Sequence, residues 1–402
     1  MKFSVGTNWD PELISGLSRF GRVEDVYAKL AEDMVGGGRP AYVVPKVTSE
    51  EVAAHIEDCH RHGIEFTYLL NASCLYGREF DEEWRREFAK MLDGLVDMGV
   101  DRVTVAIPYL IEVVKARHPR LKVNVSSFAE VNSVERARRF ARMGADEVTF
   151  DFLSMQRDFK LMAAMVKSVE TRFQVLGNHT CLHHCPSRTY HANLSSHGSQ
   201  QQRRGEGAIL DYCVLECLNT KLTDPSELIR SQWIRPEDLW HYEEIGIDKV
   251  KLVDRSRSTE WILKVVEAYV NRRTPGDNLI EVLNAVGSGG LPFADFGEFL
   301  KADAARPELA QTLGALAMRQ FLLLDNRQLD GFLDRVKEID CRSTDCDACG
   351  YCAEVASRAV RIHPDLEPEL AKRFPAIREG LQQYLTGVYT GSIFEDRGPA
   401  QE

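Results

Sequence analysis

The sequence predicts an α/β fold: a (β/α)8 TIM-like barrel with a long Cys-rich insertion after strand 7 and a C-terminal helical, Cys-rich extension. Eight short β-branched runs alternate with amphipathic helical stretches, and most of these runs are apolar on both faces, as covered parallel strands are. The connection after the seventh run is abnormally long, and the chain beyond Arg273 has a wholly helical pattern. A doubly wound open sheet is the alternative that the same alternation allows.

The predicted strands are short runs that the helical stretches separate. They cover residues 3–7, 23–28, 64–71, 102–108, 122–127, 147–151, 172–178 and 249–254, with 40–44 as a ninth candidate. Apolar residues recur every three or four positions between them, which predicts helices over 49–63, 82–99, 133–144 and 157–170. Several of these stretches end in glycine, the usual helix terminator.

The chain of 402 residues is long enough for a barrel and an appendage. We expect residues 1–275 to form the barrel, with residues 179–233 as an insertion that binds a cluster. Residues 290–390 are expected to form a C-terminal helical domain with a second cysteine cluster. Since TIM barrels carry their active sites in the loops after the strands, the long insertion marks the functional end.

Composition and charge narrow the class of partner. A net charge of −11 argues against a general binder of nucleic acids, which needs clustered Lys and Arg, although it does not exclude one. The expected substrate is a small molecule, and an anionic one would need only one or two arginines. No signal peptide or membrane-length apolar run is visible, so we expect a cytoplasmic protein with no membrane association.

Eight of the ten cysteines fall in groupings typical of metal sites. Cys181 pairs with Cys185, and Cys213 pairs with Cys217, each four positions apart, which brings both sulfurs to one side of a helical turn. Four such thiolates can hold a tetrahedral zinc or a [4Fe–4S] cluster. The alternative is four unligated core cysteines, but the surrounding sequence is too polar for a core run.

The second grouping is the segment "CRSTDCDACGYC" near the C-terminus. Its spacing is C-x4-C-x2-C-x2-C, and the tight two-residue gaps resemble the loops that wrap iron–sulfur clusters. Zinc is the alternative by ligand type, and a redox-active dithiol is a third possibility. The candidate ligands are Cys341, Cys346, Cys349 and Cys352.

Several charged and titratable residues lie at the predicted strand ends or in the insertion. Arg255 or Lys251 would pair with a carboxylate or phosphate of the substrate. Asp151 or a histidine of the insertion would transfer protons. The histidines considered are His183, His184, His191 and His197. The alternative role for each polar strand-end residue is a helix cap or a loop cap.

The run "WIRPEDLWHYEEIGIDKVKLVDRSRSTEWILKVVEAYVNR" resembles the peptidase U32 family, whose members carry a helix, a K-I-E-G-R-like strand end and a helix with an aliphatic-Tyr-Arg pattern. Lys251, Arg255 and Tyr269 fall at matching places. The stretches "VEDVYAKL" and "MGVDRVTVAIPYLIEVVKARHPRLKVNVSSFAEVNS" are similar as well, so the resemblance spans roughly residues 1–275. Two departures are the cysteine spacing and Val253-Asp254 in place of Glu-Gly.

The resemblance implies a barrel-like domain with a [4Fe–4S] cluster, and here it implicates Cys181, Cys185, Cys213 and Cys217 as ligands. Several relatives support oxygen-independent hydroxylation of RNA bases or a quinone precursor, with prephenate as oxygen donor in some. We therefore expect an iron–sulfur redox enzyme, with a second cluster on the C-terminal cysteines that passes electrons to the first. An electron-donor protein and a homodimer or heterodimer are the expected partners.

Two other classes of protein remain open at this point. One is a zinc-dependent hydrolase or lyase, in which a metal-bound water attacks the substrate. The other is a non-catalytic iron–sulfur subunit of a heteromeric complex. The sequence contains no H-E-x-x-H and no G-x-S-x-G motif, so it supplies no recognisable protease site.

Overall fold

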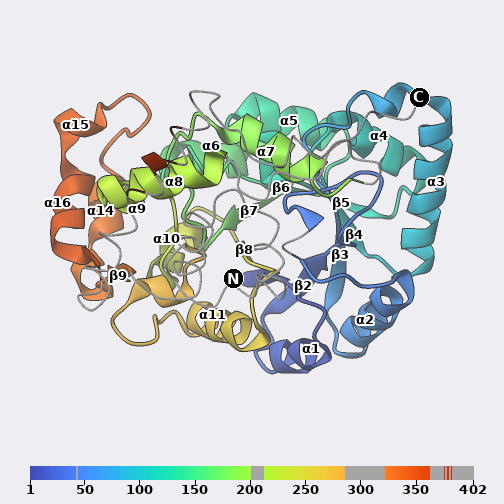
Figure 1. The fold of residues 1–402 in the computed structure, drawn as a ribbon, viewed down its shortest axis with the longest axis horizontal. Helices are drawn as coiled ribbons and strands as arrows, with labels where there is room; N and C mark the ends of the chain where they lie inside the picture. The colour runs from blue at the N-terminus through green and yellow to red at the C-terminus, as the bar shows by residue number, and fades with distance from the viewer. Residues whose placement is uncertain are drawn as a thin grey trace.

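The computed structural model describes residues 1–41, 44–200, 212–285 and 322–362, together with residues 375, 378, 379 and 382. Eight parallel strands form a closed barrel in sequence order, with β8 paired to β1 (Figure 1). The closure confirms the (β/α)8 barrel and excludes the open sheet. The strands are β1 (Lys2–Gly6), β2 (Val23–Ala28), β3 (Glu65–Leu70), β4 (Arg102–Val105), β5 (Lys122–Val125), β6 (Glu147–Thr149), β7 (Arg172–Leu176) and β8 (Lys249–Leu252).

All eight predicted strands are found. The ninth candidate was wrong where it can be checked, because Pro40, Ala41 and Val44 lie outside any strand; Tyr42 and Val43 lie outside the described residues. This stretch follows β2, whose partner in the barrel is β3. A β-branched run is therefore not enough to make a barrel strand, since each strand needs two neighbours to pair with.

Helices surround the barrel, and their side-chain caps explain where they begin. Thr48 accepts a hydrogen bond from the Glu51 amide in a reciprocal capping box, and Asp81, Asp158 and Ser258 cap later helices in the same way. The four predicted helices are present with slightly shifted ends. The outer helices are α1 (Pro11–Ser18), α2 (Ser49–Arg61), α3 (Glu82–Asp97), α4 (Pro108–Arg117), α5 (Val134–Arg142), α6 (Phe159–Ser168) and α11 (Thr259–Asn271).

A network of buried charges fills the amino-terminal end of the barrel. Lys249, which is fully buried, lies 2.7 Å from Asp25 and 2.9 Å from Glu147. Arg102 lies 3.2 Å from the same Asp25 carboxylate. Together these cations hold the pKa of Asp25 at about 2, against the opposing effect of its burial. The network occupies this end of the barrel, so open space remains at the carboxyl ends of the strands.

The β7–β8 connection is the long insertion, and residues 201–211 within it lie outside the described residues. Its helices run beside the barrel mouth (Figure 1). Hydrogen bonds join the α7 region to the loops after β2 and β3, because Ser196 accepts from the Ser73 amide and Ser199 accepts from the Gly37 amide. The helices are α7 (Arg188–His197), α8 (Tyr212–Thr223), α9 (Ser226–Arg230) and α10 (Leu239–Glu243).

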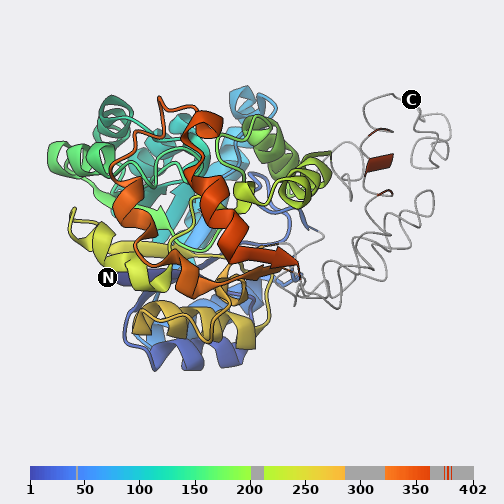
Figure 2. The same cartoon turned by 90° about the vertical axis from the view of Figure 1, so that its left-hand side faces the viewer.

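The C-terminal extension is described over residues 322–362 and at residues 375, 378, 379 and 382, so most of the predicted domain at 290–390 lies outside the described residues. Helix α16 packs against α9 of the insertion, and its core residues join the same apolar cluster as the barrel (Figures 1 and 2). No described helix is long and apolar enough to span a membrane. The elements are β9 (Leu322–Leu324), α14 (Phe332–Val336), α15 (Cys346–Cys349), α16 (Tyr351–Ala359) and β10 (Val360–Ile362), the two strands pairing antiparallel.

Candidate active site at the barrel mouth

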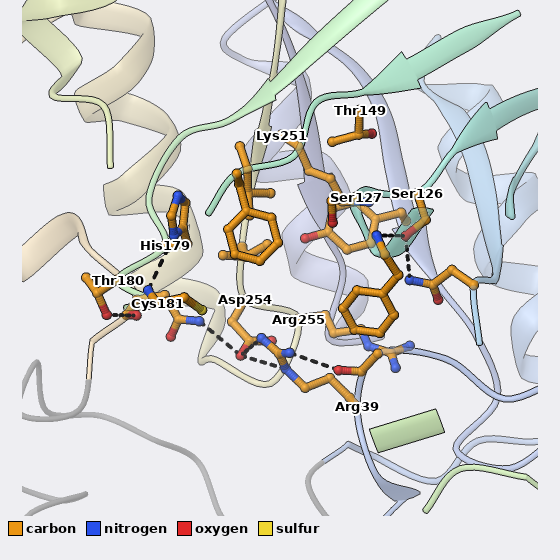
Figure 3. A pocket seen from close by; sticks show the side chains of 18 of the residues that line it. Arg39, Ser126, Ser127, Thr149, His179, Thr180, Cys181, Lys251, Asp254 and Arg255 are labelled. Atoms are coloured by element: carbon orange, nitrogen blue, oxygen red, sulfur yellow. Dashed lines mark hydrogen bonds and ion pairs between the residues drawn. The ribbon is translucent and has the colours of Figure 1, made fainter. Parts of the chain in front are cut away.

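A cavity of about 290 Å³ opens at the carboxyl ends of the strands (Figure 3). Strand ends and the insertion both contribute to its wall. Five basic side chains and a single carboxylate line it, among the residues that the structure describes. Its polar and charged lining residues are Tyr27, Arg39, Asn71, Thr104, Ser126, Ser127, Thr149, His179, Thr180, Cys181, Cys217, Lys221, Lys251, Asp254, Arg255, Arg257 and Asn284.

Arg255 is a buried cation of this cavity whose guanidinium is only partly hydrogen-bonded. The residue is 4% exposed, its Nη1 is buried without a hydrogen-bond partner, and no carboxylate in the described chain lies within ion-pairing distance of it. Burial, aided by the nearby Arg39, lowers the pKa of Arg255 to about 10, so the side chain is charged at neutral pH. Its backbone packs against Gly6, where an added Cβ would lie 2.9 Å from the Arg255 nitrogen.

The one carboxylate of the cavity is already paired. Asp254 accepts hydrogen bonds from Nη2 and Nε of Arg39 at 2.9 and 3.1 Å. This partner holds the pKa of Asp254 well below its usual range despite burial, which acts in the opposite direction. The Arg39–Asp254 pair is therefore neutral overall, and Arg255 remains as a positive charge facing the cavity. A buried cation of this kind favours an anionic ligand.

Lys251 reaches the cavity from the inner face of β8. Its Nζ lies 3.8 Å from the centre of the Tyr27 ring, while the Tyr27 hydroxyl donates to the Leu252 carbonyl at 2.9 Å. Burial lowers the pKa of Lys251 to about 8. An amine with a pKa this close to neutrality can both release and accept a proton, which suits acid–base chemistry.

Part of the cavity wall is polar and uncharged, and Figure 3 labels Ser126, Ser127 and Thr149 among its residues. The Asn71 amide donates to Ser126 Oγ at 3.4 Å, whereas Asn71 Oδ1 is buried without a donor. A buried acceptor that has no partner costs free energy, so this oxygen is suited to a ligand hydroxyl or amide.

The histidine at the cavity wall, His179, is fully engaged with the backbone. Its Nδ1 accepts from the Cys181 amide at 3.3 Å, and its Nε2 donates to the Gln232 carbonyl at 3.1 Å. Burial lowers the pKa of His179 to about 3, so the ring is neutral. Because both ring nitrogens are in use, His179 cannot activate the Cys181 thiol as a base.

Sulfurs from both cysteine pairs of the insertion reach the mouth. Cys181 and Cys217 line the cavity, and the charge of Cys217 raises the pKa of both Cys181 and Cys185, although burial is the larger cause. Cys213 is buried one turn before Cys217 on α8. Lys221 acts on the same thiols with positive charge. All ten cysteines are described, and none forms a disulfide.

These thiols do not form a closed metal site as they lie. Among the residues that the structure describes, no group of three or more His, Cys, Asp or Glu side chains has a metal-binding arrangement. Three soft sulfur donors from two separate segments nevertheless influence one another beside two cations, Lys221 and Arg188. The donor set therefore fits an anionic iron–sulfur or zinc centre in chemistry, and holding one would require the segments to close together.

The predicted proton-transfer residues do not line the cavity. His183 donates from Nδ1 to the Leu153 carbonyl, and burial lowers its pKa to about 4; His184 and His191 are exposed. Asp151 accepts from the Leu153 amide and the Ser154 hydroxyl, and lies 3.5 Å from Arg188. The structure thus places Lys251 and Arg255 at the cavity and these four residues around it.

Other lining residues lay outside the sequence prediction, among them Tyr27, Arg39 and Asn284. The place of Tyr27 could have been predicted, because it lies two residues after Asp25 in β2 and therefore on the same inner face of the strand. Lys251 stands in the same relation to Lys249 in β8. The places of Arg39 and Asn284 could not, because they sit in loops whose course the local sequence does not determine.

The C-terminal cysteines lie in the extension. Cys346 and Cys349 are on α15, Cys352 is on α16, and Cys341 precedes them. Cys349 and Cys352 pack against the main apolar cluster.

Comparison with known proteins places similar sequences in one family. The model of the family described as Peptidase family U32 matches residues 39–274. The "Uncharacterized protease MJ1657" of Methanocaldococcus jannaschii is 30% identical over 338 residues, covering 84% of this chain and 89% of that protein. Among solved structures, the U32 peptidase Mk0906 is 21% identical with a TM-score of 0.47, covering 63% of this chain and 92% of that chain. A tryptophan synthase α-subunit from Pyrococcus furiosus is 10% identical with a TM-score of 0.36, covering 67% and 92%. By its family model and its archaeal relative, the chain belongs to peptidase family U32.

Proposed function

We propose that this chain is an iron–sulfur enzyme that carries out oxygen-independent hydroxylation, or related redox chemistry, on a small anionic substrate. The observation that supports it most is the composition of one cavity wall. A buried guanidinium without a counter-charge and thiols from both cysteine pairs of the insertion face the same space. The first selects an anion, and the second can hold a redox centre beside it.

Arg255 would bind a carboxylate or phosphate of the substrate, because its guanidinium is buried at the cavity and Nη1 has no hydrogen-bond partner in the described chain. Asn71 Oδ1, which also lines the cavity, would accept a hydrogen bond from a substrate hydroxyl or amide. Two contacts from different elements fix the orientation of a small molecule as well as its position.

Cys181, Cys185, Cys213 and Cys217 would hold the cluster, with Lys221 and Arg188 offsetting part of its negative charge. When bound, a cluster supplies one-electron transfer at the mouth of the cavity. Lys251 would hold or release a proton at Nζ next to the substrate. An electron-donor protein is the partner that such chemistry requires, and a dimeric assembly remains a prediction.

The names of the relatives raise proteolysis as another activity. The cavity lacks the geometry for a Cys–His pair at His179, since that ring receives the Cys181 amide and donates to the Gln232 carbonyl. We therefore do not assign a peptide-bond nucleophile to this cavity.

The test is anaerobic purification of the full chain, with an absorption spectrum and counts of iron and acid-labile sulfide. Cys181→Ala and Cys217→Ala should each lose one cluster's worth of iron and sulfide. Cys59→Ala is the matched control, because Cys59 is buried in the core away from the mouth. Zinc without sulfide would favour the hydrolase instead and refute the redox proposal. Iron and sulfide unchanged in both mouth variants would refute the ligand assignment.

A further inference from the structure

We propose that Cys341, Cys346, Cys349 and Cys352 form a second, separate metal centre of four thiolates, and that the buried guanidinium of Arg157 balances its negative charge. The comparisons assign no such site, and it does not depend on the chemistry at the barrel mouth. The argument rests on the local geometry of the cysteine segment and on a cation buried beside it.

The segment is folded tightly by its own backbone. The Asp345 side chain accepts from the amides of Asp347 and Ala348 at 2.8 and 3.2 Å, which starts the single turn of α15. Gly350 then takes a left-handed conformation with φ of 66° and joins α15 to α16. This turn places the last three cysteines on two successive short helices within seven residues, as C-x2-C-x2-C ligation requires.

Arg157 lies under this segment as an enclosed cation. It is 6% exposed, and its guanidinium carbon lies 4.9 Å from the ring centres of both Trp233 and Phe332. It donates to the carbonyls of Ile229 and Trp233 at 2.6 and 3.4 Å, whereas its Nε is buried without a partner. No described carboxylate forms an ion pair with it, and Asp238, whose charge acts on Arg157, is already paired with Arg235 at 2.9 Å.

The charge of Arg157 acts on this cysteine group. Among the groups that interact with the guanidinium electrostatically, Cys352 and Cys341 are the cysteines, at the two ends of the segment. Arg157 and Cys341 also line a common cavity of about 500 Å³. Leaving a guanidinium buried without an anion is costly, and that cost falls if the adjoining thiols ionise together on a metal.

The charge balance identifies the class of ligand. Four thiolates carry four negative charges, so either Zn²⁺ or a [4Fe–4S]²⁺ cluster leaves a net charge of about −2 on the centre. The solvent-facing neighbours Asp340, Asp345 and Asp347 are acidic, and the exposed Arg342 lies 3.6 Å from Asp158. The buried side offers Arg157; Arg230 also acts on Cys346, but it is already paired with Glu227 at 2.7 Å and Asp347 at 3.3 Å. Because the sulfurs are not in a metal-binding arrangement as described, we expect the metal to draw the loop of Cys341 onto α15.

The ligand assignment is tested on the anaerobically purified full chain. Cys349→Ser should lose one metal centre while the mouth centre stays, and Cys181→Ala should show the reverse pattern. Absorption and sulfide counts then distinguish a cluster from zinc, and either identity supports a four-thiolate centre. Stripped Cys181→Ala protein, in which the mouth site is broken, should develop a thiolate-to-cobalt charge-transfer band on titration with Co²⁺, and the double variant Cys181→Ala/Cys349→Ser should lack it. If Cys349→Ser keeps the metal content of the unaltered chain and the double variant keeps the cobalt band, the site is wrong.

The role of Arg157 is tested by two substitutions of similar side-chain length, one that removes the positive charge and one that keeps it. Arg157→Met should weaken Co²⁺ binding at this site by about 10- to 100-fold, whereas Arg157→Lys should retain most of the affinity. Removal of the metal should lower the melting temperature less in Arg157→Met than in the unaltered chain, because the variant leaves no unpaired cation behind. Equal affinity in the Lys and Met variants, together with equal melting shifts, would overturn the pairing. If Arg157→Met does not fold, the same comparison is made between Arg157→Lys and the unaltered chain, where a loss beyond tenfold would overturn it.

Discussion

Replacing Arg255 with methionine should stabilise the fold while weakening the binding of anionic ligands. The fall in its pKa from 12.5 to about 10 corresponds to about 3 kcal/mol of free energy against the charged side chain in the folded chain. This cost is present at every pH below about 10, because the guanidinium is protonated there in both folded and unfolded chains. A neutral side chain of similar length removes the cost, and some lost packing offsets part of the gain.

For a chain of 402 residues, 1 kcal/mol shifts the melting temperature by about 1 °C. We therefore expect Arg255→Met to melt about 1–3 °C higher in scanning calorimetry. A buried charge pair with a ligand carboxylate contributes about 2–5 kcal/mol to binding, so the variant should bind at least thirtyfold more weakly. The probes are inorganic phosphate and a panel of short mono- and dicarboxylates, scored by thermal shift and calorimetric titration.

Arg273→Met is the matched control, because Arg273 is exposed and outside the cavity. It should change neither melting temperature nor probe binding. The reasoning about Arg255 fails if Arg255→Met melts several degrees lower than the unaltered chain. It also fails if the variant keeps the thermal shift that the best anionic probe gives with the unaltered protein.

Three further substitutions test other parts of the structure. Lys249→Met should cost about 3–5 kcal/mol in urea unfolding, because it leaves the carboxylate of Asp25 buried without its closest cation; an unchanged midpoint would contradict this. Stability should rise from about pH 8 to pH 10.5, because unfolded Lys251 stays protonated there while the native side chain does not. Urea unfolding across that range should show no such rise in Lys251→Met. Gly6→Ala should weaken binding of the same anionic probes without altering the metal content, because its Cβ would press on the Arg255 backbone at 2.9 Å; undiminished binding would show that the loop can yield.

The strands were predictable because the period of their apolar residues reports burial directly. The strands β4 and β5 show this, since their valines are fully buried: Val103, Val105, Val123 and Val125. Their apolar character alone was enough to predict buried strands. The run at 40–44 is also apolar, but its described residues Pro40, Ala41 and Val44 lie outside the barrel strands. Pairing is a property of the whole sheet, which the local sequence does not contain.

The site was predictable only where a strand fixed it. Arg255 follows β8 directly and Lys251 lies within it, so their place at the mouth followed from the fold class. His183, His184 and His191 belong to the insertion, where the path of the chain decides which side chains face the cavity. Histidine side chains suit proton transfer, which is why they were predicted. In the structure, however, His183 bonds the Leu153 carbonyl, and His184 and His191 are exposed to solvent.

The packing of α16 against α9 has a practical consequence for anyone who wishes to cut this protein into parts. The family match ends at residue 274, which invites expression of the barrel alone. Trp233 is 1% exposed, and its ring centre lies 5.9 Å from that of Phe332. Truncation at residue 274 would therefore expose a hydrophobic aromatic surface beside the insertion. A truncated protein would therefore tend to aggregate. Helix α9, beside the barrel mouth, would lose its packing against α16.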